Sequence, residues 1–121
     1  MSLDQSIPVL VVDDYQTMIR IILNLLKQIG FKNGTAGLAM LKQKKYGLVI
    51  SDWNMAPMTG YELLQQVRAD AELCDLPFIM VTAEATTENV IAAKKAGVSN
   101  YIVKPFNAET LRNKISAVLG Q

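Results

Sequence analysis

The chain has 121 residues, half of them hydrophobic, and its 12 lysines and arginines nearly balance its 11 aspartates and glutamates. This length predicts one domain with one core, over residues 1–121, and the balanced charge argues against a nucleic-acid-binding or membrane-surface protein. The single cysteine, Cys74, cannot form an internal disulfide, and no apolar run approaches the ~20 residues that span a bilayer. We therefore expect a soluble cytoplasmic protein.

Strand-like and helix-like segments alternate along the chain. Four short runs rich in valine and isoleucine, without polar alternation, are typical of strands buried on both faces of a parallel sheet. They cover residues 7–12, 47–51, 77–82 and 101–103. The stretches between and after them are candidate helices, with the weakest pattern in the second: residues 15–30, 35–47, 59–70, 86–97 and 107–120. The alternation predicts one α/β domain with a helix-covered parallel sheet.

Capping residues support four of these helices. Candidate starts are Thr59 with Glu62 at capping-box spacing, Thr86 or Thr87, and Asn107, and candidate stops are Gly30 and Gly97. No repeat, linker or low-complexity segment interrupts the pattern.

Polar side chains gather where the predicted strands end. Asp13 and Asp14 follow the first strand, Asp52 the second and Lys104 the last, and Thr82 ends the strand at 77–82. Parallel strands place their carboxyl ends on one edge, which is where ligands bind in such sheets, so these residues should share a crevice.

This constellation has the composition of a phosphoryl-transfer site. Two carboxylates about 4 Å apart repel by about 4 kcal/mol at an effective dielectric of ~20, so clustered acids favour a bound cation. Oxygen ligands with open positions suit Mg²⁺. A metal, Lys104 and Thr82 together could hold the three equatorial oxygens of a phosphoryl group attacked by Asp52.

Four segments of the chain resemble the signature segments of response-regulator receiver domains, and in particular CheY-like single-domain chemotaxis regulators. They are "VLVVDDYQTM", "LVISDWNM", "FIMVTAEA" and "NYIVKPF", in this order and each at a strand end. The resemblance covers nearly the whole chain. It implies a flavodoxin-like doubly wound parallel sheet with five βα units, and a two-component signalling switch.

The resemblance also implies roles for residues around the acids. Asp52 would accept a phosphoryl group from a phosphohistidine on a sensor histidine kinase. Mg²⁺ would be held by Asp14, Asp52 and the backbone carbonyl of Asn54, with Asp13 supporting the metal through water. Lys104 would pair with Asp52 and then with the phosphoryl group.

A second set of roles concerns the switch and its output. Thr82 would move toward the phosphoryl oxygen and Tyr101 would turn inward after it, while Asn54 and Glu84 would tune self-dephosphorylation. The output face implied by the resemblance comprises Ala85, Val90, Tyr101, Val103 and Lys114. Its implied target is another protein, such as a flagellar motor switch component. The domain would be a signalling protein rather than an enzyme, catalysing only its own phosphorylation and slow dephosphorylation.

Two other readings share parts of this pattern. A flavodoxin-like flavin protein would need a loop rich in serine, threonine and glycine after the first strand, where this chain is acidic. A phosphatase of the haloacid dehalogenase type also uses an aspartyl nucleophile, Mg²⁺ and lysine, but would need a second aspartate where this chain has Asn54. The phosphatase is the alternative hypothesis.

The chain departs from the receiver pattern after Phe31. Receivers place a second strand there, spanning about 15 Å at ~3.3 Å per residue, whereas residues 32–34 can reach only about 10 Å. We expect this strand to be shortened or missing, which would leave the strand at 7–12 as a possible open edge. An open edge can pair with another chain, so dimerisation or strand exchange is possible beside a monomer.

Overall fold

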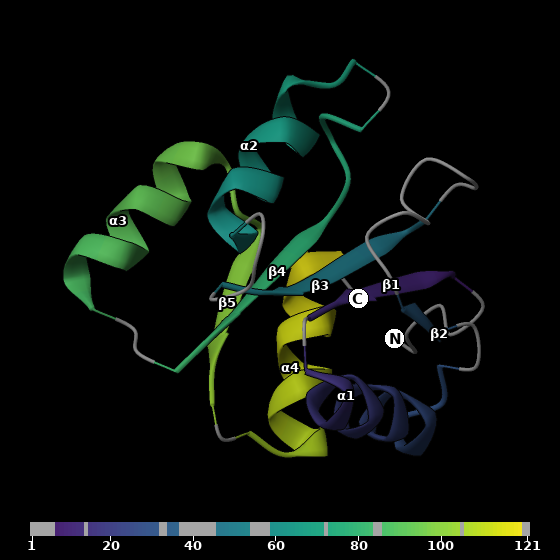
Figure 1. The fold of residues 1–121 in the computed structure, drawn as a ribbon. Coiled ribbons are helices and arrows are strands. Elements are labelled where there is room, and N and C mark those ends of the chain that lie inside the picture. Colours follow the sequence, from purple (N-terminus) through teal and green to yellow (C-terminus); the bar gives the residue numbers. More distant parts are fainter. Residues whose placement is uncertain are drawn as a thin grey trace.

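Helices and parallel strands alternate in a computed structural model of the chain, which describes residues 7–13, 15–31, 34–36, 46–53, 59–71, 73–83, 86–104 and 106–119 (Figure 1). The strands are β1 (Val9–Val12), β2 (Gly34–Ala36), β3 (Leu48–Asp52), β4 (Phe78–Thr82) and β5 (Asn100–Val103). The helices are α1 (Gln16–Gln28), α2 (Gly60–Ala69), α3 (Thr87–Ala96) and α4 (Ala108–Leu119). The strands form one parallel sheet in the order β2-β1-β3-β4-β5. This is the predicted flavodoxin-like, doubly wound arrangement.

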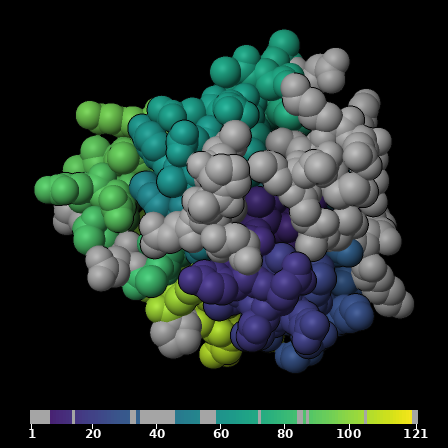
Figure 2. All heavy atoms as spheres, in the orientation of Figure 1, coloured from purple at the N-terminus to yellow at the C-terminus, as the bar shows by residue number. Residues whose placement is uncertain are grey.

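The sheet separates two apolar cores, as expected for strands without polar alternation. On one face, α1 and α4 pack on β1, β3, β4 and β5 through residues such as Ile22, Leu26 and Ile115. On the other face, α2 contributes Leu63 and Leu64 to a core with residues of β1, β3 and β4. Figure 1 shows α1 and α4 on one side of the sheet and α2 and α3 on the other, and in Figure 2 the purple and yellow atoms accordingly lie at the bottom of the view and the teal and green atoms at the top and left. Every residue of β1, β3 and β4 is buried.

The predicted helix caps are confirmed. The Thr59 side chain accepts from the Glu62 backbone N–H at 3.2 Å, and Glu62 accepts in return from the Thr59 N–H. Thr86, rather than Thr87, caps α3, and Asn107 Oδ1 accepts from the Thr110 N–H at 2.9 Å at the start of α4. These bonds satisfy N–H groups that the first helical turn leaves without partners.

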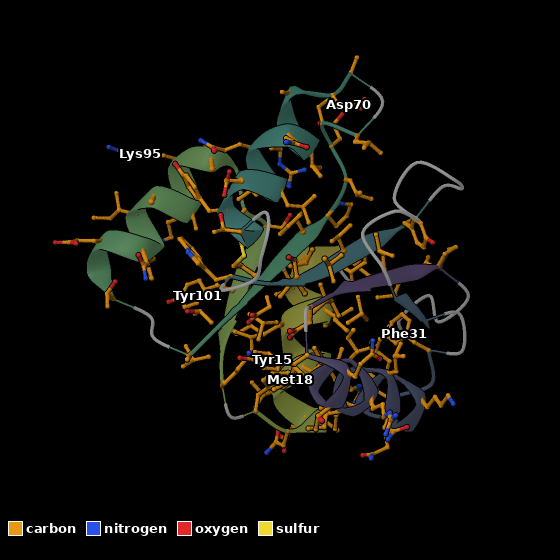
Figure 3. The ribbon with its side chains drawn as sticks, in the orientation of Figure 1. Tyr15, Met18, Phe31, Asp70, Lys95 and Tyr101 are labelled. Carbon is orange, nitrogen blue, oxygen red and sulfur yellow. The ribbon has the colours of Figure 1, made fainter. Side chains whose placement is uncertain are left out.

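The end of α1 is built as a Schellman motif. Gly30 takes a φ of 100°, which favours glycine, and its N–H donates to the Lys27 carbonyl. The Phe31 N–H donates to the Leu26 carbonyl at 2.8 Å. Phe31 is thereby turned back into the core at 1 % exposure, beside the end of α1 in Figure 3. Gly97, with a φ of 94°, ends α3 as predicted.

The second strand is present but short, which confirms the first of the two predicted outcomes, whereas the possible open edge at the first strand was wrong. Gly34–Ala36 pairs in parallel with Val9–Val11, and β1 therefore lies inside the sheet instead of forming an open edge. The tight turn at Gly30 directs the chain back toward the sheet directly after α1, which lets three residues serve as a strand. Thr35 and Ala36, placed in a helix by sequence, belong to this strand. Of the rest of that predicted helix, residues 37–45 lie outside the described residues, whereas Tyr46 and Gly47 are described, are not helical and lead into β3.

Arg68 joins three segments at the amino-terminal edge of the sheet. Its guanidinium donates to the carbonyls of Leu76 at 2.6 Å, Gly97 at 2.8 Å and Cys74 at 3.2 Å. Partial burial lowers the pKa of Arg68 below its ordinary value, and nearby Asp75 opposes that shift. The guanidinium still remains protonated at neutral pH. Arg68 thus links the end of α2 to the segment entering β4 and to the end of α3. Cys74 is exposed in that connecting turn.

Candidate functional site

An ion pair between a partly exposed lysine and a buried aspartate occupies the carboxyl-terminal edge of the sheet. Asp52 ends β3 and is 3 % exposed, and Lys104 follows β5. Lys104 Nζ lies 2.8 Å from Asp52 Oδ1, so the predicted proximity of these residues is confirmed. The Lys104 side chain keeps 22 % exposure, whereas that of Asp52 keeps 4 %. A carboxylate buried to this extent needs positive charge beside it, and Lys104 supplies it.

The strand register brings the other two described candidates to the same edge. Val12 of β1 lies opposite Ser51 of β3. Asp13 and Asp52 directly follow these two residues, so they come at the same level of the two neighbouring strands. Asp52 lies opposite Val81 on the next strand. Thr82 follows Val81 and is 5 % exposed. The Lys104 N–H donates to the Thr82 carbonyl at 2.8 Å, which holds the base of the lysine against β4.

Asp13 is oriented by the first turn after β1. Its Oδ1 accepts a hydrogen bond from the Tyr15 N–H at 2.9 Å, a local turn of the kind that aspartate favours before a helix. Asp13 is partly buried, whereas Tyr15 beside it is 66 % exposed. The turn therefore fixes one carboxylate oxygen of Asp13 at the edge where β1 ends.

Four of the predicted site residues, namely Asp14, Asn54, Glu84 and Ala85, lie outside the described residues. Within the described ranges, no group of three or more His, Cys, Asp or Glu side chains lies close enough together to hold a metal ion. Asp13 and Asp52 are the described carboxylates of the predicted metal set, and their roles remain predictions.

An open hollow lies next to Thr82, on the side of the sheet that α2 and α3 cover. It is lined by Trp53, Met80, Thr82, Asn89, Val90, Ala93 and Tyr101. Tyr101 is half-buried at the margin of the core on this side of the sheet (Figure 3). The predicted switch residues Thr82 and Tyr101 therefore border one space.

The predicted output residues that are described lie around Tyr101. Lys114 of α4 places its Nζ 5.2 Å from the centroid of the Tyr101 ring, which is a cation–π contact. Val103 is two residues along β5 on the same face and is 38 % exposed. Val90 of α3 lines the hollow with Tyr101. The structure thus brings Val90, Tyr101, Val103 and Lys114 together, but it does not test their function.

Tyr61 was missed by the sequence reasoning. Its ring stacks on Trp53, with centroids 5.7 Å apart and planes inclined by 19°. Trp53 directly follows Asp52 and also lines the hollow, so the stack connects the first turn of α2 to the site. No local pattern marks such a pair, because it forms across the connection between β3 and α2.

Comparison with known proteins assigns the class. Residues 9–116 match the family model described as the response regulator receiver domain. Chemotaxis protein CheY-3 of Vibrio cholerae is 47 % identical over 122 residues, covering 96 % of this chain and 94 % of that protein. Among solved structures, Vibrio cholerae CheY4 matches with a TM-score of 0.87 and 30 % identity, over 93 % of this chain and 98 % of that one.

A more distant solved structure shares the fold. It is the receiver domain of the sensor histidine kinase PA1611 from Pseudomonas aeruginosa, solved with a magnesium ion coordinated in its active-site cleft. Its TM-score is 0.84 at 21 % identity, over 96 % of this chain and 99 % of that one.

The fold and the edge site define a doubly wound α/β domain with an acidic centre at the carboxyl ends of its strands. The chain belongs to the response regulator receiver domain family. It is a phosphorylation-dependent signalling domain, and these comparisons give no support to the haloacid dehalogenase alternative. In the part of the chain that the structure describes, no helix has the length and apolar character needed to cross a bilayer.

Proposed function

We propose that Asp52 is the residue that accepts the phosphoryl group and that the chain is a chemotaxis switch. The observation that carries this proposal is the buried Asp52 carboxylate with Lys104 Nζ 2.8 Å from its Oδ1. A carboxylate held in one orientation by a cation is positioned for attack on phosphorus, and the same ammonium can stabilise negative charge on the transferring group. The phosphodonor is a phosphohistidine of a sensor histidine kinase.

Mg²⁺ fits the donor set at this edge. Asp13 and Asp52 are carboxylates at adjacent strand ends, and Asp14 and the Asn54 carbonyl would complete an all-oxygen set of the kind Mg²⁺ prefers. When bound, the ion supplies positive charge that offsets the carboxylates and the phosphoryl oxygens. Lys104 holds the attacking carboxylate, and the Thr82 hydroxyl would donate to a phosphoryl oxygen.

Thr82 and Tyr101 carry the signal away from Asp52. Both side chains border the hollow beside Thr82, so a movement of Thr82 toward Asp52 would enlarge the space available to the Tyr101 ring. An inward turn of Tyr101 would remove its ring from Lys114 and change the surface that Val103 and Lys114 share. Glu84 and Asn54 would set how long the phosphorylated state lasts.

The output is binding of another protein. The surface formed by Val90, Tyr101, Val103 and Lys114, with Ala85, is the docking face, and a flagellar motor switch component is the proposed target. The CheY-3 relative at 47 % identity supports the chemotaxis assignment. We place the protein in the cytoplasm as a monomer. The monomer is supported by β2, which covers the edge of β1 that would otherwise be open to another chain.

Intact-mass measurement with a small phosphodonor tests this function. Acetyl phosphate with Mg²⁺ should add one phosphoryl group to the protein, and the adduct should decay slowly once the donor is removed. Omission of Mg²⁺ should suppress the adduct. Continuous turnover of simple phosphate esters, without a covalent adduct, would contradict the proposal.

A further inference from the structure

The first residue of α2 lies against the backbone of Asp52. Gly60 is buried, and its N–H donates to the Trp53 carbonyl at 2.9 Å. A Cβ built at position 60 would overlap the Asp52 carbonyl oxygen, approach the Asp52 carbonyl carbon to 3.0 Å and approach the Met80 sulfur to 2.8 Å. Glycine therefore permits a contact between helix and strand that no other residue type could make without movement.

The overlap cannot be absorbed locally. Asp52 is held in the sheet opposite Val81, and the Trp53 N–H donates to the Val81 carbonyl at 2.8 Å. On the other side, α2 is fixed by buried Leu63 and Leu64 and by the capping box at its start. A methyl group at position 60 must therefore displace either the Asp52 backbone or the first turn of α2, because packed interiors leave no free space.

Either displacement changes the surroundings of Asp52. Moving the Asp52 backbone would alter its pairing with Lys104, whose Nζ lies 2.8 Å from Oδ1. Moving the first turn would break the Gly60–Trp53 hydrogen bond and shift Tyr61, whose ring stacks on Trp53. Displacements of about 1 Å can cost a hundredfold in rate when reacting groups must be aligned.

We propose that Gly60 is a positioning residue for Asp52, which keeps the start of α2 in contact with the backbone of the phosphoryl acceptor and thereby fixes the direction of its carboxylate. The expected effect of Gly60 on the phosphorylation rate rests on the proposed function. The expected change in geometry, in which added bulk at position 60 reorients Asp52 relative to Lys104, does not depend on any reaction.

Gly60→Ala tests the proposal against two control variants. Gly47→Ala makes the same chemical change just before the opposite end of β3, where the three nearest atoms to the added Cβ all belong to the Ile7 side chain, at 3.0–3.4 Å, and none belongs to a backbone. Val67→Ala removes buried volume from α2 away from Asp52 and serves as a control for lost stability. Each variant is examined for unfolding in urea and for the rate of phosphorylation by saturating acetyl phosphate with Mg²⁺.

The expected result is a phosphorylation rate at least tenfold lower in Gly60→Ala, with less than a twofold change in Gly47→Ala and Val67→Ala. Equal rates in all three variants, or losses that simply follow stability, would overturn the proposal. If Gly60→Ala does not fold, Thr59→Ala loosens the same turn without added bulk. At least a twofold loss of rate is then expected relative to Val67→Ala, and an unchanged rate would overturn the proposal.

A second readout separates this proposal from the proposed function. NMR signals of the Asp52 carboxyl and the Lys104 ammonium, recorded without phosphodonor, should shift in Gly60→Ala and stay unchanged in Gly47→Ala. If the unmodified protein takes no phosphoryl group but these signals shift, the reaction assignment fails and the positioning role stands. If the protein is phosphorylated and the signals do not shift, the positioning role fails alone.

Discussion

Lys104 Nζ lies 2.8 Å from Oδ1 of Asp52, although their strands are not neighbours. β4 lies between β3 and β5, so the lysine side chain reaches across the end of β4 to the buried carboxylate. The Lys104 N–H is anchored on the Thr82 carbonyl at the end of that intervening strand. The lysine therefore contacts both strands that carry the proposed acceptor and the proposed switch threonine.

Replacing Lys104 by alanine should leave the protein folded and impair its signalling. Because Lys104 is partly exposed, water can take the place of its ammonium beside the buried Asp52 carboxylate, so loss of the pair should lower the free energy of unfolding by about 1–3 kcal/mol. The phosphorylated variant should show a weaker change at Tyr101, since the ammonium no longer orients the phosphoryl group. Urea unfolding measures the stability and tyrosine NMR measures the change at Tyr101. Lys94→Ala, at an exposed position of α3, is the control. Loss of cooperative unfolding would show instead that the lysine is mainly structural.

Magnesium should change the fluorescence of Trp53. This residue is the only tryptophan, it directly follows Asp52, and it is partly exposed. A cation at the acidic edge alters the electric field at the neighbouring indole, so the signal should saturate with added Mg²⁺. Sodium chloride at equal ionic strength is the control, and Asp52→Asn should weaken the response. A flat titration of the unmodified protein would speak against metal binding at this edge.

Lys114 should bias Tyr101 toward its present position. A cation–π contact at a partly exposed site contributes about 0.5–1 kcal/mol, so Lys114→Met should shift the ratio of outward to inward ring positions roughly two- to fivefold toward inward. Fluorine NMR of fluorotyrosine-labelled protein, with Tyr101→Phe to assign the signal, measures this ratio. Arg112→Met, at an exposed position of α4, should have no effect. An unchanged ratio in Lys114→Met would show that the contact does not restrain the ring.

Arg68 lies at the edge of the sheet remote from the site and should be important for the stability of the fold. Arg68→Ala removes charged donors from three backbone carbonyls and should lower the free energy of unfolding by about 2–3 kcal/mol. Arg68→Lys should recover less than half, because an ammonium cannot reproduce the planar fork of donors. Urea denaturation compares both with Arg112→Ala at an exposed site. Equal stability of Arg68→Ala and Arg112→Ala would contradict this role.

The sequence predicted the elements whose signals are local. Apolar runs marked β1, β3, β4 and β5, and the caps at Thr59, Thr86 and Asn107 set three helix starts. The expectation that all four strands are buried on both faces was wrong for β5, which lies at the edge of the sheet and buries only Ile102. Convergence of Asp52 and Lys104 was also predictable, because a parallel sheet brings all its carboxyl ends to one edge. The order of strands needed no separate information once the receiver pattern was recognised.

Features that depend on tertiary contact were not predictable in this way. β2 was doubted because residues 32–34 are too few to cross the sheet and residues 35–47 were assigned to a helix; the pairing of Gly34–Ala36 with β1 supplies what local preference does not. The Trp53–Tyr61 stack and the close approach of Gly60 to Asp52 arise where α2 returns to the end of β3. Their partners lie on either side of the connection between β3 and α2, whose path no local sequence signal specifies, so only the folded chain reveals them.

The most direct test of the account is the mass of the Asp52→Asn variant after treatment with acetyl phosphate and Mg²⁺, beside the unmodified protein. Asparagine keeps the size of the side chain and removes the carboxylate oxygen that would bond to phosphorus. If Asp52 is the phosphoryl acceptor, one phosphoryl group is added to the unmodified protein and none to the variant. An equal adduct on the folded variant would place the phosphoryl group elsewhere and contradict the assignment of Asp52.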